Sequence, residues 1–338
     1  MSDLTALPKG SLILVTGANG YIGAHVIDNL LKLGYHVRGT VRAEKPWLKE
    51  LFDKYGEGAF EQVVVPHLED EEALGHAMTG TAGVVLVASD LSLSNDAQKV
   101  IPFVVKATEI ALSAAAKHDS IKRVVLTSSA FAASTPEANE TGVVVDENTY
   151  NERAIKAAWD PNTPAHRMPF MVYAASKAEG EKAAWKWVEE HKPGYVFNTI
   201  LPNFTTGEIL HPQISGSTMK MAADVLTGNH APLKAFMPQP YVDAGDVARL
   251  HTVALLAESV KSKRIFAAAR PVNVSDFIDV LRELRPDNKL IPEKDANDGH
   301  DLTQVLPLAE AEKLLQTYFG QKGWTPLKES VEAGIRNF

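Results

Sequence analysis

The amino-acid sequence predicts an α/β fold built on a doubly wound parallel sheet. Short apolar runs recur through the first 201 of the 338 residues, and stretches with helical periodicity separate most of them. Parallel neighbours need a crossover connection, which a helix usually supplies. The run at 82–88 is apolar at nearly every position, so we expect both of its faces to be covered. The expected strands are residues 12–15, 36–41, 62–65, 82–88, 123–128 and 196–201, and the longest expected helices are 97–117 and 170–191.

The first expected strand ends in a glycine-rich turn. Gly17 lets the chain turn, Gly20 lets a pyrophosphate approach the backbone, and Gly23 lets the helix that follows pack closely on its strand. The amide groups and the positive dipole end of a helix N-terminus favour anions. A purely structural turn needs glycines too, but the strand before and the helix after favour dinucleotide binding. The expected cofactor-binding residues of this turn are Gly17, Asn19, Gly20, Tyr21, Ile22 and Gly23.

The end of the second strand indicates which cofactor binds. A cofactor with a free ribose hydroxyl favours a carboxylate about twenty residues past the glycines, and the chain has Val41 and Arg42 there. A carboxylate would repel a 2′-phosphate, whereas a guanidinium binds it through paired, charge-assisted hydrogen bonds. The sequence therefore predicts NADPH/NADP rather than NAD, with Lys45 close enough to share the role. The alternative is that Arg42 is only a solvated cation at a strand end.

A serine, a tyrosine and a lysine are the candidate catalytic residues. Tyr173 and Lys177 are i, i+4 neighbours in the helical pattern 170–191, so they share one face. A phenol titrates near 10, and a neighbouring ammonium would lower its pKa toward the range of a general acid. Ser129 follows the fifth strand at the edge where open α/β sheets bind ligands, and its hydroxyl could donate to a carbonyl oxygen that gains negative charge. Thr127 and Ser128 are the alternatives, as caps of the strand or a turn.

Taken together, these motifs resemble the extended short-chain dehydrogenase/reductase family, whose cofactor sheet is of the Rossmann type. Within it, the resemblance is nearest to the dihydroflavonol reductase and cinnamoyl-CoA reductase group and to fungal NADPH-dependent aldehyde and carbonyl (ketone) reductases of the aldehyde reductase II type. The resemblance extends over most of the chain. The segments that carry it are 14–20, 37–40, 125–129, 172–177, 201–204, 216–218 and 323–324.

The resemblance implies transfer of a hydride from NADPH to an aldehyde or ketone carbon. Tyr173 would protonate the alkoxide, and Ser129 would orient the carbonyl. Lys177 would bind the nicotinamide ribose and lower the pKa of the phenol. Pro202 would border the nicotinamide. The other positions expected to bind the cofactor are Ala88, Ser89, Thr127, Asn203 and Phe204.

Two departures from the family pattern affect the expected site. His67 precedes Leu68 where relatives usually place an Asp, which leaves the contacts to adenine open. Asp90 follows the fourth strand, where it faces solvent or, as the less favoured alternative, the substrate. The candidate residues of an apolar pocket for aryl or bulky carbonyl compounds, each with plain packing as its alternative, are Phe131, Phe170, Phe204, Met237 and Tyr241.

Composition excludes several other classes of function. The formal net charge of −8 makes binding to nucleic acid or to an anionic membrane unexpected, because both need a basic face. The chain has no cysteine, which excludes disulfides and thiolate ligands, and its eleven histidines show no metal-binding spacing. No apolar run is long enough to span a bilayer, and residues 1–10 do not resemble a signal peptide. The cytoplasm is the expected location, and the expected partner is a small aldehyde or ketone. Nothing in the sequence indicates the oligomeric state.

The residue pattern divides the chain into two parts. Residues 1–201 are expected to form the NADP-binding Rossmann-type domain that carries the catalytic residues. From about Pro202 onward, prolines interrupt short helical pieces, so 202–338 is expected to be mainly a smaller C-terminal substrate-binding elaboration. Segments within about 241–270 are expected to return to the main sheet.

Two other functions fit this kind of fold. A sugar-nucleotide epimerase or dehydratase would keep NAD bound and recycle it, and Arg42 in place of an acid speaks against that. A regulator that senses NADP without catalysis need not keep a Ser, Tyr and Lys set, and this chain has all three.

Overall fold

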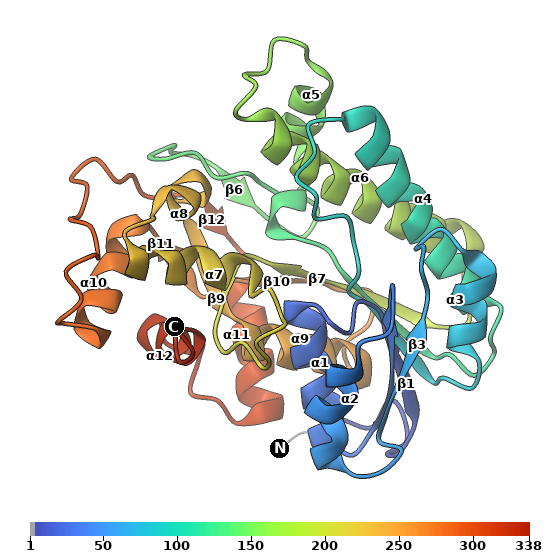
Figure 1. Cartoon of the computed structure of the whole chain (residues 1–338). Helices are drawn as coiled ribbons and strands as arrows, with labels where there is room; N and C mark the ends of the chain where they lie inside the picture. Colours follow the sequence, from blue (N-terminus) through green and yellow to red (C-terminus); the bar gives the residue numbers. More distant parts are fainter. Residues whose placement is uncertain (1–3) are drawn as a thin grey trace.

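The computed structural model describes residues 4–338 and contains a central sheet of seven parallel strands, in the order β10-β7-β5-β4-β1-β2-β3 (Figure 1). The predicted doubly wound parallel sheet is confirmed. The strands are β1 (Leu12–Val15), β2 (His36–Val41), β3 (Phe60–Val64), β4 (Gly83–Leu86), β5 (Arg123–Thr127), β7 (Val196–Pro202) and β10 (Arg264–Ala267).

Helices cover both faces of this sheet (Figure 1). On one face, α1 (Tyr21–Lys32) packs against α9 (Ala244–Leu256). On the other, α4 (Ala97–Ala116) packs against α3 (Glu71–Met78) and against α6 (Met168–His191). The short α2 (Pro46–Phe52) and the 3-10 turn η1 (Asp53–Tyr55) connect β2 to β3.

Alternation along the central strands builds these two layers. Ile13 and Val15 of β1 belong to the core that includes α1 and α9, whereas Leu14 between them belongs to the core that includes α3 and α4. Successive side chains of a strand point to opposite faces, so a continuous apolar run supplies both cores. All four residues of β4 are buried, as the apolar run at 82–88 predicts, although the strand itself is shorter.

The C-terminal half adds a second, smaller sheet of three strands, in the order β11-β9-β8. Its strands are β8 (Phe204–Thr206), β9 (Gln239–Asp243) and β11 (Arg270–Val272). Around it, toward the left of Figure 1, lie α7 (Ser217–Ala223), η3 (Asp224–Thr227), α8 (Ala231–Phe236), α10 (Val274–Leu284) and α12 (Leu327–Gly334).

The segment at 241–270 divides between the two sheets. Residues 241–243 lie in β9, which pairs with β8 and β11 of the smaller sheet and not with the main sheet. The chain then crosses back, because α9 is almost entirely buried and packs on β7 and β5. Strand β10 pairs in parallel with β7 at the edge of the main sheet.

An excursion between β5 and α6 completes the fold. It holds η2 (Ala130–Ala132), β6 (Val144–Val145) and α5 (Glu152–Trp159), and β6 pairs with β12 (Gln304–Val305) from the C-terminal half. The later α11 (Leu308–Phe319) packs on β10 and α9. Within residues 4–338, the structure has no helix with the length and apolar character needed to cross a membrane.

Candidate functional site

A large cleft opens at the carboxyl ends of the central strands. Its volume is about 1030 Å³, at the upper end of the range for small-molecule sites. The sheet order changes direction between β1 and β4, and open α/β sheets bind ligands at such a point. The sequence-predicted residues that line it are Gly17, Asn19, Gly20, Tyr21, Ile22, Gly23, Arg42, Ala88, Ser89, Asp90, Thr127, Ser129, Phe131, Tyr173, Lys177, Pro202, Asn203 and Phe204.

The glycine turn forms one wall of the cleft. Gly17 has φ +70°, a left-handed conformation that side chains disfavour, and the Gly20 amide donates to its carbonyl oxygen at 2.9 Å. A Cβ on Gly23 would lie 2.3 Å from the same oxygen, so the turn and α1 can approach this closely only without a side chain. Because α1 begins after Gly20, which has no side chain to cap it, the first amide groups of the helix are left for an anion.

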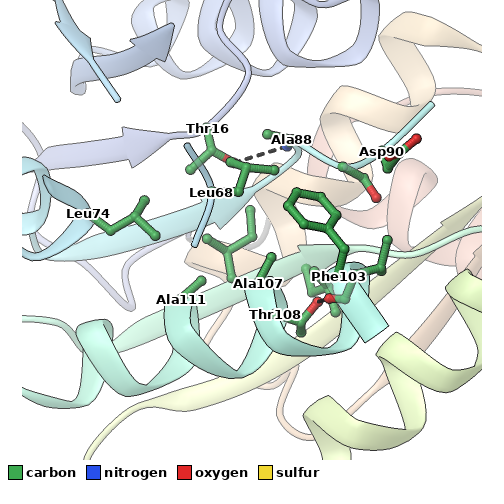
Figure 2. A pocket seen from close by; sticks show the side chains of 13 residues that line it. Thr16, Leu68, Leu74, Ala88, Asp90, Phe103, Ala107, Thr108 and Ala111 are labelled. Carbon is green, nitrogen blue, oxygen red and sulfur yellow. Dashed lines mark hydrogen bonds between the residues drawn. The ribbon is translucent and has the colours of Figure 1, made fainter. Parts of the chain in front are cut away.

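Thr16 joins this wall to the next strand. Its Oγ1 accepts hydrogen bonds from the backbone amides of Val87 and Ala88, at 2.9 and 3.0 Å, which fixes the chain after β4 against the end of β1. Below that contact, a smaller cavity of about 30 Å³ adjoins the cleft, and Figure 2 shows Phe103 and Ala107 of α4 pointing into it. Leu68 and Phe103 line both spaces, so the cleft continues into an apolar recess.

Arg42 and Lys45 have different surroundings. Arg42 is exposed, lines the cleft and has no ion-pair partner among residues 4–338. Lys45 does not line the cleft. It precedes α2, and its backbone amide donates to the side chain of Gln62 at 3.1 Å. Arg38 turns away, because its guanidinium donates to Glu61 at 2.6 Å and to two backbone carbonyls.

The hydroxyls of Thr127, Ser128 and Ser129 point to three different partners. The Thr127 hydroxyl meets His251 Nε2 of α9 at 2.7 Å, and the Ser128 hydroxyl donates to Glu181 of α6 at 2.9 Å. Of the three, Ser129 is the residue whose side chain acts on the phenol of Tyr173, where it lowers the phenol's pKa. The geometry therefore favours Ser129 over its two neighbours as the residue that faces the reacting groups.

Tyr173 and Lys177 are both on α6, and this helix brings them beside Ser129 at the end of β5. The Ser129 Oγ also accepts from the Phe131 amide at 3.2 Å, which fixes the side chain at the start of η2. Lys177 is 7% exposed, and its Nζ donates to the backbone oxygen of Thr127 at 3.4 Å. The end of β5 and one face of α6 thus meet in the cleft.

Burial determines the charge states of these groups. It raises the pKa of the Tyr173 phenol, and the nearby Ser129 hydroxyl offsets this only in part. The direction is opposite to the one expected from Lys177, because loss of solvent penalises the phenolate. Burial also lowers the pKa of Lys177 to about 8, against the opposing influence of Glu181 and Asp90. At neutral pH, the site therefore presents a protonated phenol next to a Lys177 ammonium that loses its proton more easily than a lysine in water.

Three of the residues expected in the substrate pocket do not line the cleft. Phe170 lies behind it and packs edge-on against Phe236, with ring centroids 4.7 Å apart. The Tyr241 hydroxyl donates to the backbone oxygen of Thr325 at 3.0 Å, and Met237 packs against the main core. These side chains were expected to line the pocket because they are aromatic or apolar and lie in loop-rich segments. In the structure they pack against other parts of the protein instead.

Other residues take their place around the cleft. Phe236 supplies an aromatic wall, and His67 also lines the cleft. The segments involved lie between prolines and have no clear periodicity, so the sequence contained little signal for them beyond the motif at 216–218. Further lining residues include Pro66, Leu68, Glu69, Phe103, Thr205, Gln213, Ser215, Ser217, Thr218 and Gln239.

No group of three or more histidine and acidic side chains that could hold a metal ion occurs within residues 4–338. The candidate site thus consists of the glycine turn, a cation at the end of β2, and the Ser129, Tyr173 and Lys177 cluster.

Fold and glycine turn together define a dinucleotide-binding α/β protein. The chain belongs to the NAD dependent epimerase/dehydratase family, whose model matches residues 13–269, that is, to the extended short-chain dehydrogenases/reductases. It is 44% identical over 334 residues to ketoreductase adrE of Penicillium rubens, covering 97% of each chain. It is 37% identical over 336 residues to aldehyde reductase 2 of Sporidiobolus salmonicolor, covering 98% of this chain and 96% of the relative.

A solved structure shows the same fold. The yeast methylglyoxal/isovaleraldehyde reductase Gre2, complexed with NADPH, superposes with a TM-score of 0.80 at 24% identity, over 96% of this chain and 97% of that one.

Proposed function

We propose that the protein reduces aldehydes or ketones to alcohols, with NADPH as the hydride donor. The observation that carries the proposal is the cluster of Ser129, Tyr173 and Lys177 in the cleft that also contains the glycine turn. The names of the relatives support it, since ketoreductases and an aldehyde reductase are 37–44% identical over nearly the whole chain.

The residues around the cleft fit NADPH. The glycine turn and the first amides of α1 would hold the pyrophosphate, since a Cβ on Gly23 would fill the close approach there. Arg42 would hold the 2′-phosphate. It follows β2, three strands away from β5, or about 14 Å at the usual strand spacing, which suits an extended ligand. Leu68 and Phe103 offer an apolar surface for the adenine. The carboxylate expected from the family pattern is absent there, because His67 stands at that position.

The protein's own groups supply the proton chemistry, and bound NADPH supplies the hydride. Tyr173 would give its phenolic proton to the carbonyl oxygen as that oxygen gains negative charge, so the product would be an alcohol and Tyr173 would be left as a phenolate. The raised pKa of Tyr173 keeps the phenol protonated beforehand. Ser129 is placed to donate a hydrogen bond to the same oxygen. The Lys177 ammonium would hold the ribose and stabilise the phenolate.

A spectrophotometric assay tests this proposal. Purified protein should consume NADPH when aromatic aldehydes or β-ketoesters are added, and Tyr173→Phe should abolish turnover while leaving NADPH affinity nearly unchanged, since it removes only the proton donor. Substantial turnover by that variant would overturn the mechanism. Tightly co-purifying NAD would instead favour an epimerase or dehydratase, and NADPH binding without turnover of any carbonyl compound would favour a regulator.

A further inference from the structure

A buried carboxylate lies one helical turn beyond Lys177. Glu181 follows Tyr173 and Lys177 at intervals of four residues on α6, so the three share one face of the helix. Tyr173 and Lys177 line the cleft, whereas Glu181 does not, and its side chain is fully buried. A buried ionised carboxylate is costly unless charges and hydrogen bonds compensate it, so its partners show what it holds in place.

Glu181 joins four separate elements. Its Oε2 accepts from the Ser128 hydroxyl at the end of β5, at 2.9 Å. Its Oε1 accepts from the Thr199 hydroxyl of β7 at 2.7 Å and from the Trp185 indole of α6 at 3.4 Å. The guanidinium of Arg264, from β10, binds both oxygens, at 2.9 and 3.0 Å. The carboxylate therefore ties α6 to three neighbouring strands, of which β5 and β7 end at the cleft.

Arg264 is itself fixed from several sides. Its third nitrogen donates to the backbone oxygens of Glu147 and Thr149, at 2.8 and 2.9 Å, and its guanidinium lies 4.2 Å from the centre of the Tyr150 ring. Its side chain is only 6% exposed. A two-point ion pair with this much support has little freedom to move, so Glu181 has a definite position relative to α6.

The same carboxylate acts on Lys177. The charges that favour the ammonium of Lys177 are Glu181, on its own helix, and Asp90, on the chain after β4. The end of β5, which also contacts Lys177, presents only the uncharged residues Thr127, Ser128 and Ser129. The other titratable group on this face of α6 is Tyr173, which is protonated at neutral pH. Two acidic groups thus oppose the burial that would otherwise discharge Lys177.

We propose that Glu181 is a positioning residue of the site, which supplies the buried counter-charge for the Lys177 ammonium and, through Ser128, fixes the strand end that carries Ser129 against α6. This role rests on the proposed function, because it matters only if Lys177 works as a cation beside the reacting groups. Glu181 does not line the cleft.

The test compares Glu181→Gln with Glu179→Gln. The second variant makes the same chemical change on the same helix, at a side chain that is 35% exposed and pairs with Lys182 at the surface. Two quantities are measured against pH in each protein, namely kcat/KM with NADPH and an aromatic aldehyde, and the dissociation constant of NADPH from fluorescence. Wild-type activity and affinity should fall as the pH rises through about 8, where Lys177 loses its proton.

Glu181→Gln should move this alkaline limb to lower pH by about one pH unit in both measurements, since a neighbouring opposite charge is lost. Glu179→Gln should leave the limb where it is. A folded Glu181→Gln protein with the wild-type limb would overturn the proposal. A wild-type protein that neither binds NADPH nor turns over any carbonyl would instead contradict the proposed function.

The single variant leaves Arg264 buried without its partner and can fail to fold for that reason. The double variant Glu181→Gln/Arg264→Met removes both charges of the pair and leaves no unpaired ion. It should still move the alkaline limb to lower pH, because it lacks the carboxylate near Lys177, but by less than Glu181→Gln alone, since the Arg264 cation is removed as well. A folded double variant with an unshifted limb would contradict the proposal equally.

Discussion

Thr127 and His251 connect the candidate site to the helix on the opposite face of the sheet. His251 Nδ1 lies 2.8 Å from the carbonyl oxygen of Val247, which can only accept, so Nδ1 carries the proton. Nε2 must then accept from the Thr127 hydroxyl, 2.7 Å away. The backbone oxygen of Thr127 accepts a hydrogen bond from Lys177. A neutral His251 therefore stabilises the strand end to which Lys177 is bonded.

Protonation of His251 should destabilise the fold in acid. Burial lowers the pKa of His251 from 6.5 to about 4, so the folded protein resists a proton that the unfolded chain accepts. The contribution of this residue to stability is complete above pH 6.5 and is lost as the pH falls toward 4. At about 1.4 kcal/mol for each pH unit, the loss amounts to roughly 3 kcal/mol. Urea unfolding at pH 7.5 and pH 5 should show a smaller decrease for His251→Gln than for wild type.

Exposed His76, whose side chain is 78% exposed, provides the matched control. His76→Gln should keep the wild-type dependence of unfolding free energy on pH. If His251→Gln also kept it, the buried imidazole would not be the group that titrates.

Replacement of Arg42 should change cofactor preference. Arg42→Ala removes the exposed guanidinium that lines the cleft at the end of β2, so the KM for NADPH should rise by on the order of tenfold to a hundredfold, with little change for NADH. Lys45→Ala is the comparison, because Lys45 does not line the cleft and its replacement should have a much smaller effect. Steady-state kinetics with both cofactors measure the ratio, and an unchanged ratio in Arg42→Ala would refute the assignment.

A side chain at Gly23 should disturb the glycine turn. In Gly23→Ala, the new Cβ would lie 2.3 Å from the Gly17 oxygen, so the turn or α1 must shift. We expect a loss of about 1–3 kcal/mol in unfolding free energy and weaker NADPH binding by fluorescence titration. Gly75→Ala in α3 is the matched control, since a Cβ there has no neighbour within 4 Å. It should stabilise the protein by about 0.5–1 kcal/mol and leave NADPH binding unchanged. Equal effects of the two variants would contradict the role of the turn.

Local patterns were enough to predict the parts of the site that depend on sequence neighbours. Tyr173 and Lys177 share a helical turn, and Ser129 ends an apolar run, so spacing indicated one edge of a parallel sheet, while the choice of Ser129 over Thr127 and Ser128 came from the family resemblance. The partners of Glu181 were beyond such reasoning, because Arg264 comes from a strand 83 residues further on. The sequence led us to expect a lowered pKa for Tyr173, and this was wrong. Burial raises that pKa, and the depth of burial depends on the folded chain.

The aromatic wall formed by Phe236 should select substrates. Phe236 lies at the end of α8 and lines the cleft, and its ring is supported from behind by Phe170 at 4.7 Å. Its backbone oxygen accepts from the side chain of Gln239 at 2.6 Å, which holds the helix end against β9. An aromatic ring fixed in this way can pack against an aryl group of a substrate, with a gain of about 0.5–1.5 kcal/mol beyond the buried area.

We therefore expect Phe236→Ala to raise the KM for aromatic aldehydes by roughly tenfold, while the KM for a short aliphatic aldehyde and the affinity for NADPH change little. Phe170→Leu, one layer behind the cleft, should act in the same direction but more weakly, because it only loosens the support of the Phe236 ring. Kinetics on paired aromatic and aliphatic substrates measure the difference. If Phe236→Ala affected both substrates alike, or neither, the ring would not contact the substrate, and selection would have to come from the other aromatic wall at Phe131, whose ring centre is 6.2 Å from that of Tyr173.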